Sequence, residues 1–391
     1  MSRSNMNKLI ATIIGLISLT LVALVVFAHS PSQFIQLTTN PPIGQFYPFE
    51  AEAATPQLPV QLTLEARNPK GQLLENSKFK LQILTPPLSP FLSTDFPVVE
   101  GTKLLEMEAI APQGKLEIAQ MLPIRGKYQF LVDVTPVAGD GFRPINQTLT
   151  LDVPENPVKY RNYGILLAIL LLVGIGGGWV MGKQEVSQQG EIAPARVRLL
   201  LSGAVLVAIA SLLTINISAE MAESHSHAHQ SSLEKPAVIN DAAIKLQIIG
   251  DRHATVGKVA NFQVQALDAN TNLPVKDVIF KIATTQNENN WTAFSYRGIA
   301  DTNGQFKWQQ QFFDGATHKL EVEVAPNQSS IRQFQPVVAT QEIEVAGVAT
   351  PLLTRLISLA YLVSAIAIGL AIGLWLRRRS LGTSQRVFRQ V

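Results

Sequence analysis

Three histidines at alternate positions are the side chains best suited to chemistry in this chain of 391 residues. They are His225, His227 and His229, within a stretch rich in serine, alanine and glutamate. Imidazole nitrogens bind divalent transition metals such as Cu(II), Ni(II), Co(II) and Zn(II), so the tract is a candidate metal site. The alternative is a flexible linker that binds metals weakly, because ordering the tract costs conformational entropy.

The remaining histidines add little to this metal site. His253 and His318 are further possible ligands, but His318 lies on the apolar side of an alternating stretch. That position favours a residue at the edge of a core. His29 follows the first apolar block and is interpreted as interfacial. The sequence therefore requires no cofactor, and a divalent transition metal is the one candidate.

Signatures of catalysis are missing from the sequence. The chain has no cysteine, which excludes disulfides, iron–sulfur clusters and thiol catalysis. It also lacks G-x-S-x-G, H-E-x-x-H, a Gly-rich phosphate loop and paired catalytic carboxylates. Trp291, Tyr296 and Trp308 could line a ligand surface, although sandwich cores regularly contain such rings. We therefore expect a protein that is not an enzyme, and catalysis is the most distant alternative.

Four apolar blocks are each close to the roughly 20 residues needed to cross a bilayer. They are residues 9–28, 164–181, 197–217 and 356–376. The blocks predict four transmembrane helices, separated by an N-terminus at 1–8, a loop at 182–196, a His-containing linker at 219–235 and a basic tail at 377–391. No ionisable residue lies within the cores of the blocks, which argues against a transporter or pump.

Small residues recur every four positions in two of these blocks. They are Gly174, Gly178 and Gly182 in one block, and Ala365, Gly369 and Gly373 in the other. Such ladders let helix backbones approach closely within a membrane. The alternative is the ordinary tolerance of membrane helices for glycine. Because the ladder recurs at matching places in the two blocks, helix packing is favoured. The packing partner is the sister block, another protein or a second copy of the chain.

Basic residues indicate how the chain is oriented. They gather in 1–8, in 182–198 and in 377–391. The positive-inside rule then places both termini and the middle loop in the cytoplasm, with the intervening segments in a periplasm or lumen. The expected partner is the lipid bilayer of a plasma, inner or thylakoid-type membrane. No basic patch with interleaved aromatic residues points to nucleic acid.

The two long segments between the blocks, 48–155 and 236–348, carry the pattern of β-strands. Apolar and polar residues alternate with period two, as in sheets with one buried face. Residues 127–136 align with 317–326, and matching strands precede and follow them in the same order. The sequence therefore predicts two extracytoplasmic all-β domains and an internal duplication of a helix–sandwich–helix layout.

Motifs in residues 244–346 carry a resemblance to known modules. They are Leu273-Pro274-Val275, the turn Ala-Asp-Thr-Asn-Gly-Gln-Phe at 300–306, and Asp314-Gly315 before the strand of His318. With them the second segment resembles immunoglobulin-like and transthyretin-like β-sandwich modules of bacterial envelope proteins. The resemblance implies about seven strands per copy and a role in binding or spacing. The first segment lacks the Asp-x-Asn-Gly turn, so its fold rests partly on the repeat.

These observations lead to an expected function. The chain is interpreted as an accessory, scaffold or partner-binding subunit of an envelope membrane complex, in contact with another membrane or envelope protein. The alternative is a metal-binding accessory protein that captures or delivers an ion through His225, His227 and His229.

Overall fold

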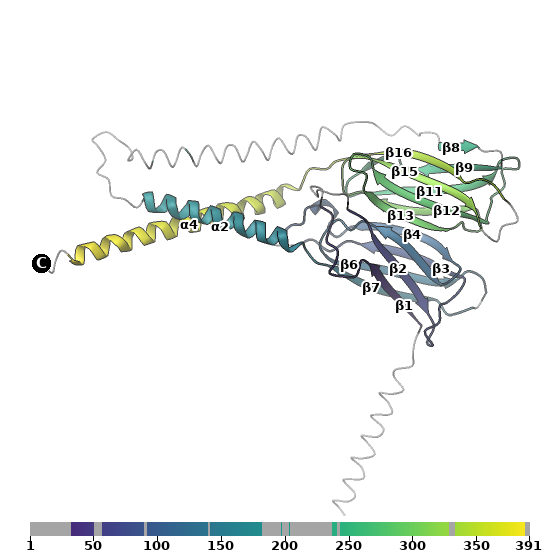
Figure 1. Ribbon diagram of the computed structural model, residues 1–391, viewed down its shortest axis with the longest axis horizontal. Coiled ribbons are helices and arrows are strands. Elements are labelled where there is room, and N and C mark those ends of the chain that lie inside the picture. Colours follow the sequence, from purple (N-terminus) through teal and green to yellow (C-terminus); the bar gives the residue numbers. More distant parts are fainter. Residues whose placement is uncertain are drawn as a thin grey trace, which may run out of the picture.

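The structure is a computed structural model. It describes residues 33–50, 57–89, 92–139, 141–181, 237–240, 243–327 and 333–387, together with positions 197 and 203. Within this part of the chain, a body built from β-strands carries two long helices that leave it at the same end (Figure 1).

The two helices are α2 (Pro157–Met181) and α4 (Leu352–Val387). Both are long and apolar enough to cross a membrane. The predicted spans 164–181 and 356–376 fall within them, whereas 9–28 and 197–217 lie outside the described residues apart from positions 197 and 203. The prediction of a four-span protein is therefore corrected, because the described part of the chain contains two helices of spanning length.

Polar residues extend α2 beyond the predicted apolar block at its beginning. Pro157 occupies the start of the helix, where its missing N–H would have no partner in any case. The Asn156 side chain accepts a hydrogen bond from the Val158 N–H over 3.0 Å, which caps the helix. Local cap chemistry therefore sets this boundary, since hydropathy marks only the apolar part.

The first lobe of the β body contains seven strands. They are β1 (Phe34–Asn40), β2 (Val60–Arg67), β3 (Ser77–Leu84), β4 (Lys103–Ala111), β5 (Lys115–Gln120), β6 (Gly126–Pro136) and β7 (Ile145–Val153), with a short 3₁₀ helix η1 (Pro97–Val99) before β4. One layer pairs in the order β1-β2-β5 and the other in the order β4-β3-β6-β7, all antiparallel.

The second lobe contains nine strands. They are β8 (Ala237–Asn240), β9 (Ile244–Gly250), β10 (His253–Thr255), β11 (Val259–Asp268), β12 (Val278–Gln286), β13 (Thr292–Ile299), β14 (Gln305–Gln311), β15 (Thr317–Pro326) and β16 (Val337–Ala346). Its layers pair in the orders β8-β9-β11-β14 and β13-β12-β15-β16-β10. The β10–β16 pair is parallel and the others are antiparallel, which makes the sheet mixed.

The two lobes are joined edge to edge by hydrogen-bonded strands. Strand β4 pairs with β14, where Glu106 lies opposite Gln309, and β5 pairs with β13, where Ala119 lies opposite Ser295. Each layer of one lobe therefore continues into a layer of the other, and all described strands form one network. The prediction of two separate sandwich domains is wrong, because these pairings close the edges that separate domains would leave open.

A single apolar core runs through both lobes. The period-two alternation correctly predicts which side chains enter it: Tyr128, Phe130, Val132 and Val134 are all buried on one face of β6. Leu320, Val322 and Val324 are buried in the same way on β15. The neighbouring positions on each strand face outward, as expected for antiparallel layers with one covered side.

Matching turns precede β5 and β14. Gly304 ends the Asp-x-Asn-Gly turn with φ of +66°, and the Asp301 carboxylate accepts hydrogen bonds from the N–H groups of Asn303 and Gln305, each over 2.8 Å. In the first lobe Gly114 has φ of +69°, and its N–H donates to the Ala111 carbonyl. The first lobe therefore makes an equivalent turn with glycine alone, without the aspartate and asparagine.

Candidate functional site

Helices α2 and α4 contact each other through glycine. The buried residues of α2 are Gly174 and Gly178. A Cβ on Gly174 would lie 2.9 Å from the Gly369 Cα, and one on Gly178 would lie 3.0 Å from the Gly373 Cα. The same Cβ atoms would meet backbone carbonyl oxygens of α4 at 2.4 and 2.2 Å. The backbones therefore touch at these two levels, and a side chain at either glycine would push the helices apart.

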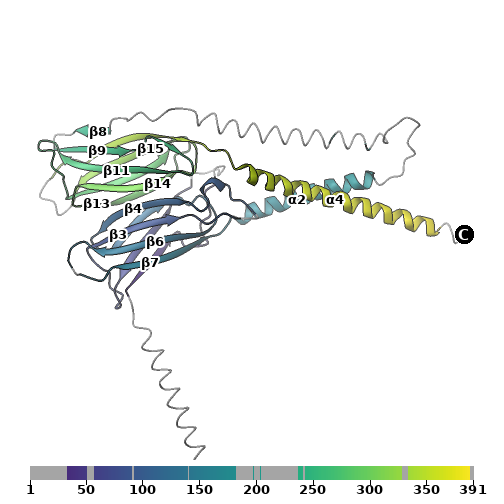
Figure 2. The same ribbon diagram turned by 180° about the vertical axis from the view of Figure 1, so that it is seen from behind.

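The helices run parallel to each other. Gly174 faces Gly369 and Gly178 faces Gly373, so moving four residues along one helix moves four residues along the other in the same direction. Both helices begin at the β body and end far from it (Figure 2). The two helices are thus parallel and touch along one face of each, at the glycines. Large apolar side chains elsewhere on both helices are exposed in the structure.

Arginine and tryptophan meet at the far end of this pair. The Arg377 guanidinium lies 5.2 Å from the ring centre of Trp179, across the helix contact. The Arg379 guanidinium lies 4.9 Å from the ring centre of Trp375. These are cation–π distances, and Trp with Arg is a pairing typical of a membrane–water interface.

At the near end, ion pairs fix α2 to the first lobe. Lys159, in the first turn of α2, pairs with Asp95 and also lies 3.7 Å from a Glu50 carboxylate oxygen. Just before the helix, Glu155 accepts from Arg125 over 2.7 Å, and both side chains are largely buried. Three separate loops of the β body therefore hold the start of α2 in place, which restrains the angle between body and helix.

An aromatic cluster joins the lobes at this same end. It consists of Phe49 and Phe96 from the first lobe and Trp291 and Phe313 from the second. Ring centres lie 4.6 Å apart for Phe49 and Trp291 and 5.4 Å apart for Phe96 and Phe313. The cluster buries apolar surface of both lobes in one contact and so fixes their relative position.

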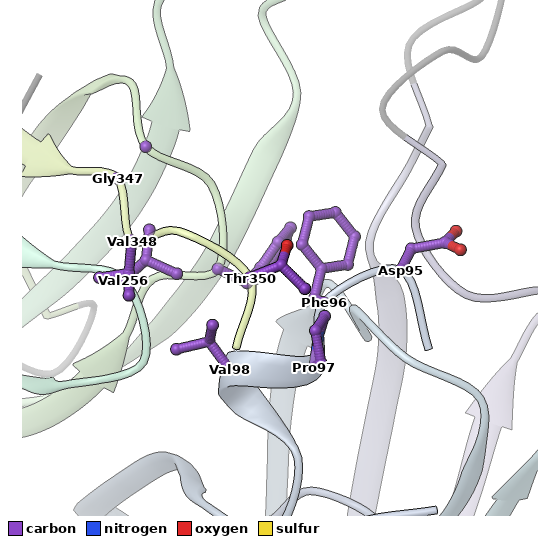
Figure 3. Close-up of a pocket in the computed structure, with 10 residues that line it drawn as sticks. Asp95, Phe96, Pro97, Val98, Val256, Gly347, Val348 and Thr350 are labelled. Carbon is purple, nitrogen blue, oxygen red and sulfur yellow. The ribbon is translucent and has the colours of Figure 1, made fainter. Parts of the chain in front are cut away.

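A small pocket lies beside the aromatic cluster, with a volume of about 270 Å³. Phe96 and Val98 line it from the first lobe, and Val256 and Val348 line it from the second, with Thr350 and Asp95 at its polar edge (Figure 3). Thr350 stands just before α4, so the pocket lies where the β body meets the helices. Its lining is mainly apolar and offers no acid–base pair.

His318 is fully buried next to this cluster, 5.5 Å from Trp291 in an edge-to-face contact. Its Nδ1 lies 2.9 Å from the Ala316 carbonyl oxygen, and Nε2 has no hydrogen-bond partner within the described part of the chain. Burial lowers the pKa of His318 to about 4, partly offset by the hydrogen bond to Ala316. The imidazole is therefore neutral at pH 7 and belongs to the core.

The residues proposed from sequence as a metal site, His225, His227 and His229, lie outside the described residues. Metal binding by this tract therefore stays a prediction. Within the described ranges, no three His, Asp or Glu side chains gather as a metal site would require. His253, on β10, lies 3.3 Å from Glu344 on the neighbouring strand β16, whereas His318 is buried on β15.

Four of the six residues predicted to pack the helices contact each other. Gly174, Gly178, Gly369 and Gly373 meet in two pairs, whereas Gly182 lies outside the described residues. Ala365 is half-buried on α4, one turn before Gly369. Trp291, Tyr296 and Trp308 are buried in the second lobe and form no ligand surface.

Sequence reasoning missed the contacts that join body and helix. Arg125, Glu155 and Lys159 are single charges with no spacing that marks them as partners. Lys159 is marked in the sequence only as a basic residue next to the predicted span 164–181 that lies outside the three regions where basic residues gather. A salt bridge to the β body accounts for that exception.

Comparisons with known proteins identify no family. No family model matches the sequence, and no curated protein matches it. Among solved structures, a copper-bound variant of FetP from uropathogenic Escherichia coli is 9% identical, with a TM-score of 0.21, covering 29% of this chain and 97% of that one. The Yersinia pseudotuberculosis adhesin InvE is 9% identical, with a TM-score of 0.20, covering 81% and 61%.

Invasin, a bacterial integrin-binding protein, is 8% identical, with a TM-score of 0.18, covering 79% of this chain and 39% of that one. The chain thus spans about three fifths of InvE and two fifths of invasin. These neighbours are β-rich proteins of the bacterial envelope. TM-scores this low carry no argument about function, so the functional conclusion must rest on the helix pair and the β body.

Proposed function

We propose that this chain is a non-enzymatic, membrane-anchored protein in which α2 and α4 cross the bilayer side by side and hold the β body on one surface. One observation carries the proposal: outside the glycine contact, large apolar side chains cover the pair and are exposed. They include Ile165, Ile169, Leu172 and Val173 on α2, and Leu356, Val363, Ile368 and Ile372 on α4. In water such a surface would be a strong aggregation site, whereas lipid chains match it.

The length of this apolar surface fits a bilayer. Eighteen helical residues separate Arg161 from Trp179, a rise of about 27 Å, and Arg355 to Trp375 spans about 30 Å. The hydrocarbon core is about 30 Å thick. Tyr160 and Tyr163 near one end and Trp179 and Trp375 near the other are placed as an aromatic belt on each side.

The basic end of the pair indicates its orientation. Arg377, Arg378 and Arg379 follow the apolar part of α4 directly. Basic residues at a helix end favour the cytoplasmic side, so the β body, at the opposite end of both helices, would lie on the outer side.

The β body then acts as a displayed scaffold. It is stiff, because strand pairing, one core and the aromatic cluster join the lobes. It is also attached to each helix by a short connection, 154–156 before α2 and 347–351 before α4. Such a body suits an accessory or partner-binding subunit, whose surface must be held at a fixed position above a membrane.

We also infer that the chain arose by duplication of a sandwich–helix unit. Both lobes pair their strands in the same order, so that β3 contacts β4 and β6 as β12 contacts β13 and β15. At the junction the two contacts correspond to each other, β4–β14 and β5–β13. The glycine pairs repeat the same relation in the helices. One approximate twofold relation therefore links lobes and helices.

Membrane extraction tests the anchor. The full chain should stay with membranes during an alkaline carbonate wash and leave only with detergent. The double substitution Ile169→Arg and Ile368→Arg should release part of it, since each buried Arg costs about 3 kcal/mol at the centre of a span. The control Leu273→Arg, on the β body, should remain bound. Recovery of the unaltered chain in the wash would contradict the proposal.

The scaffold role needs a separate test. Cross-linking of the full chain in its native membrane, followed by purification in mild detergent, should recover a stoichiometric protein partner. A chain that runs alone as a monomer after cross-linking would contradict a scaffold role while leaving the anchor intact.

A further inference from the structure

We propose that the helix-proximal end of the β body rests directly on the bilayer, with Leu88 and Leu92 placed among the lipid headgroups. The inference rests on the proposed membrane anchor and adds a second lipid-binding surface to it. That surface consists of exposed apolar side chains from the described residues of two loops of the first lobe, 85–89 with 92–96 and 41–50 with 57–59.

The short connections bring this end of the body close to the membrane. Arg161, at the start of the apolar part of α2, lies four residues after Pro157, a rise of about 6 Å. Only residues 154–156 separate that helix from β7. The body therefore has no room to stand away from the headgroup layer, and its helix-proximal loops reach the depth of the first turn of α2.

Side-chain contacts fix residues 92–95 beside the start of α2. The Arg125 guanidinium binds Glu155, just before α2, and also donates to the Leu92 carbonyl over 2.8 Å. Asp95 pairs with Lys159 in the first turn of α2. Leu92 and Asp95 are thus each connected to the beginning of α2, Leu92 through the Arg125–Glu155 pair and Asp95 through Lys159.

Large apolar side chains are exposed at this end of the body. Leu88 is 68% exposed and Leu92 is 43% exposed. In the 41–59 loop, Ile43 is 59% exposed and Leu58 is 86% exposed. This second loop is held to the same place, because Glu50 lies near Lys159 and accepts from the Asn156 amide. Four large aliphatic side chains, two from each loop, are therefore exposed at this end of the body.

Lipid is the occupant that the neighbouring residues favour. Tyr160, Arg161 and Tyr163 surround the start of α2, and these residue types prefer the headgroup region. The Asp95–Lys159 and Glu50–Lys159 pairs hold both loops beside the first turn of α2. A protein partner would have to approach within the space between the body and the lipid, which the short connections leave narrow.

Single cysteines provide the test, because the chain contains none of its own. Full-length variants Leu88→Cys and Leu92→Cys are labelled with a polarity-sensitive fluorophore and reconstituted into phosphatidylcholine–phosphatidylglycerol vesicles. We expect blue-shifted emission that is quenched by lipids carrying a nitroxide near the headgroup. Leu273→Cys is the matched control, since Leu273 is a 64% exposed leucine at the opposite end of the body. Its label should stay red-shifted and unquenched.

A third label separates this inference from the anchor. Ile169→Cys reports on α2 within the bilayer and should be quenched by nitroxides placed deep in the acyl chains. If that label is quenched while those at Leu88 and Leu92 behave like the Leu273 control, the surface contact is wrong and the anchor stands. If the Leu88 and Leu92 labels are blue-shifted but unquenched, protein covers them and the lipid contact is again overturned. An unquenched label at Ile169 would overturn the anchor.

Discussion

At the scale of single residues, the glycines of the helix contact have the sharpest structural consequences. Gly174 and Gly178 meet Gly369 and Gly373 backbone to backbone, so a methyl group at these positions has no space. Gly176 lies on the same helix, yet a Cβ there would meet nothing within 4 Å. The pair thus offers both a test position and a matched control.

We predict that Gly178→Ala weakens the helix pair, whereas Gly176→Ala does not. The added methyl at Gly178 would lie 2.2 Å from the Leu370 carbonyl oxygen and force the helices apart, at a cost of about 1–3 kcal/mol. At Gly176 the same change removes only a poor helix former. Thermal unfolding in detergent, followed by far-ultraviolet circular dichroism, measures both. Equal midpoints for the two variants would refute the close contact.

His318 makes stability depend on pH. Its pKa is about 4 in the folded protein and near 6.5 when unfolded, so the unfolded state binds the proton first as the pH falls. Stability from neutral His318 is therefore complete above pH 6.5 and is lost progressively toward pH 4, by up to about 3 kcal/mol.

The variant His318→Phe should flatten this part of the stability curve. Phenylalanine keeps a ring beside Trp291 and Phe312 but cannot take up a proton. The control His253→Gln retains His318 and should retain the acid-dependent loss. Chemical denaturation of the purified protein at several pH values gives the comparison. Parallel curves for all three proteins would show that His318 does not titrate on unfolding.

The sequence could supply part of this residue-level picture. The four-residue spacing of glycines was visible, and the alternation placed His318 on the apolar side of its strand. The identity of the helix partner was not visible, because spacing alone does not tell a sister helix from another protein. The buried Arg125–Glu155 pair was equally hidden, since its members are thirty residues apart and carry ordinary surface charges.

At the scale of elements, the junction between the lobes decides the architecture. Strands β4, β5, β13 and β14 would each be an exposed edge in an isolated sandwich, and exposed edges promote aggregation. Pairing them across the junction satisfies their backbone groups. Lys103 strengthens the contact, because its ammonium donates to Glu106 of its own lobe and to Gln309 of the other, each over 2.5 Å.

A disulfide should form across this junction. Glu106 and Gln309 are directly opposite each other, and such antiparallel partners lie about 4.5–5.5 Å apart at Cα, within disulfide range. Glu106→Cys with Gln309→Cys should therefore cross-link the lobes under mild oxidation and raise the unfolding temperature. The control pair Glu106→Cys with Gln263→Cys should not, because β14 lies between the two positions. If the control pair cross-links and the Glu106–Gln309 pair does not, the proposed pairing of β4 with β14 is wrong.

Element types were predictable from this sequence, but their assembly was not. Period-two alternation marked strands such as β6 and β15, and hydropathy marked most of α2 and α4. The alternation of apolar and polar residues shows which face of a strand is buried, but it does not show whether the edge of that strand pairs with another strand or faces water. The sequence therefore predicted separate sandwiches where the structure joins them, and it missed the polar first turn of α2 that Asn156 caps.

At the scale of the whole molecule, one axis organises the protein. The joined lobes form an elongated body, and the parallel helices continue from one end of it toward a cluster of arginines (Figure 2). Exposed large apolar residues follow one another along the middle of both helices, and the body carries the polar–apolar alternation of half-covered sheets. The proposed membrane anchor requires such an order of apolar and basic parts along a single direction.

Sided labelling tests this arrangement most directly. Leu273→Cys places a thiol at the end of the β body away from the helices. Arg378→Cys places one near the end of α4 away from the body, in a chain with no other cysteine. In sealed, oriented membrane vesicles, a membrane-impermeant maleimide should label one variant from outside and the other only after permeabilisation. If both variants are labelled from the same side of intact vesicles, the helix pair does not cross the membrane and the account is wrong.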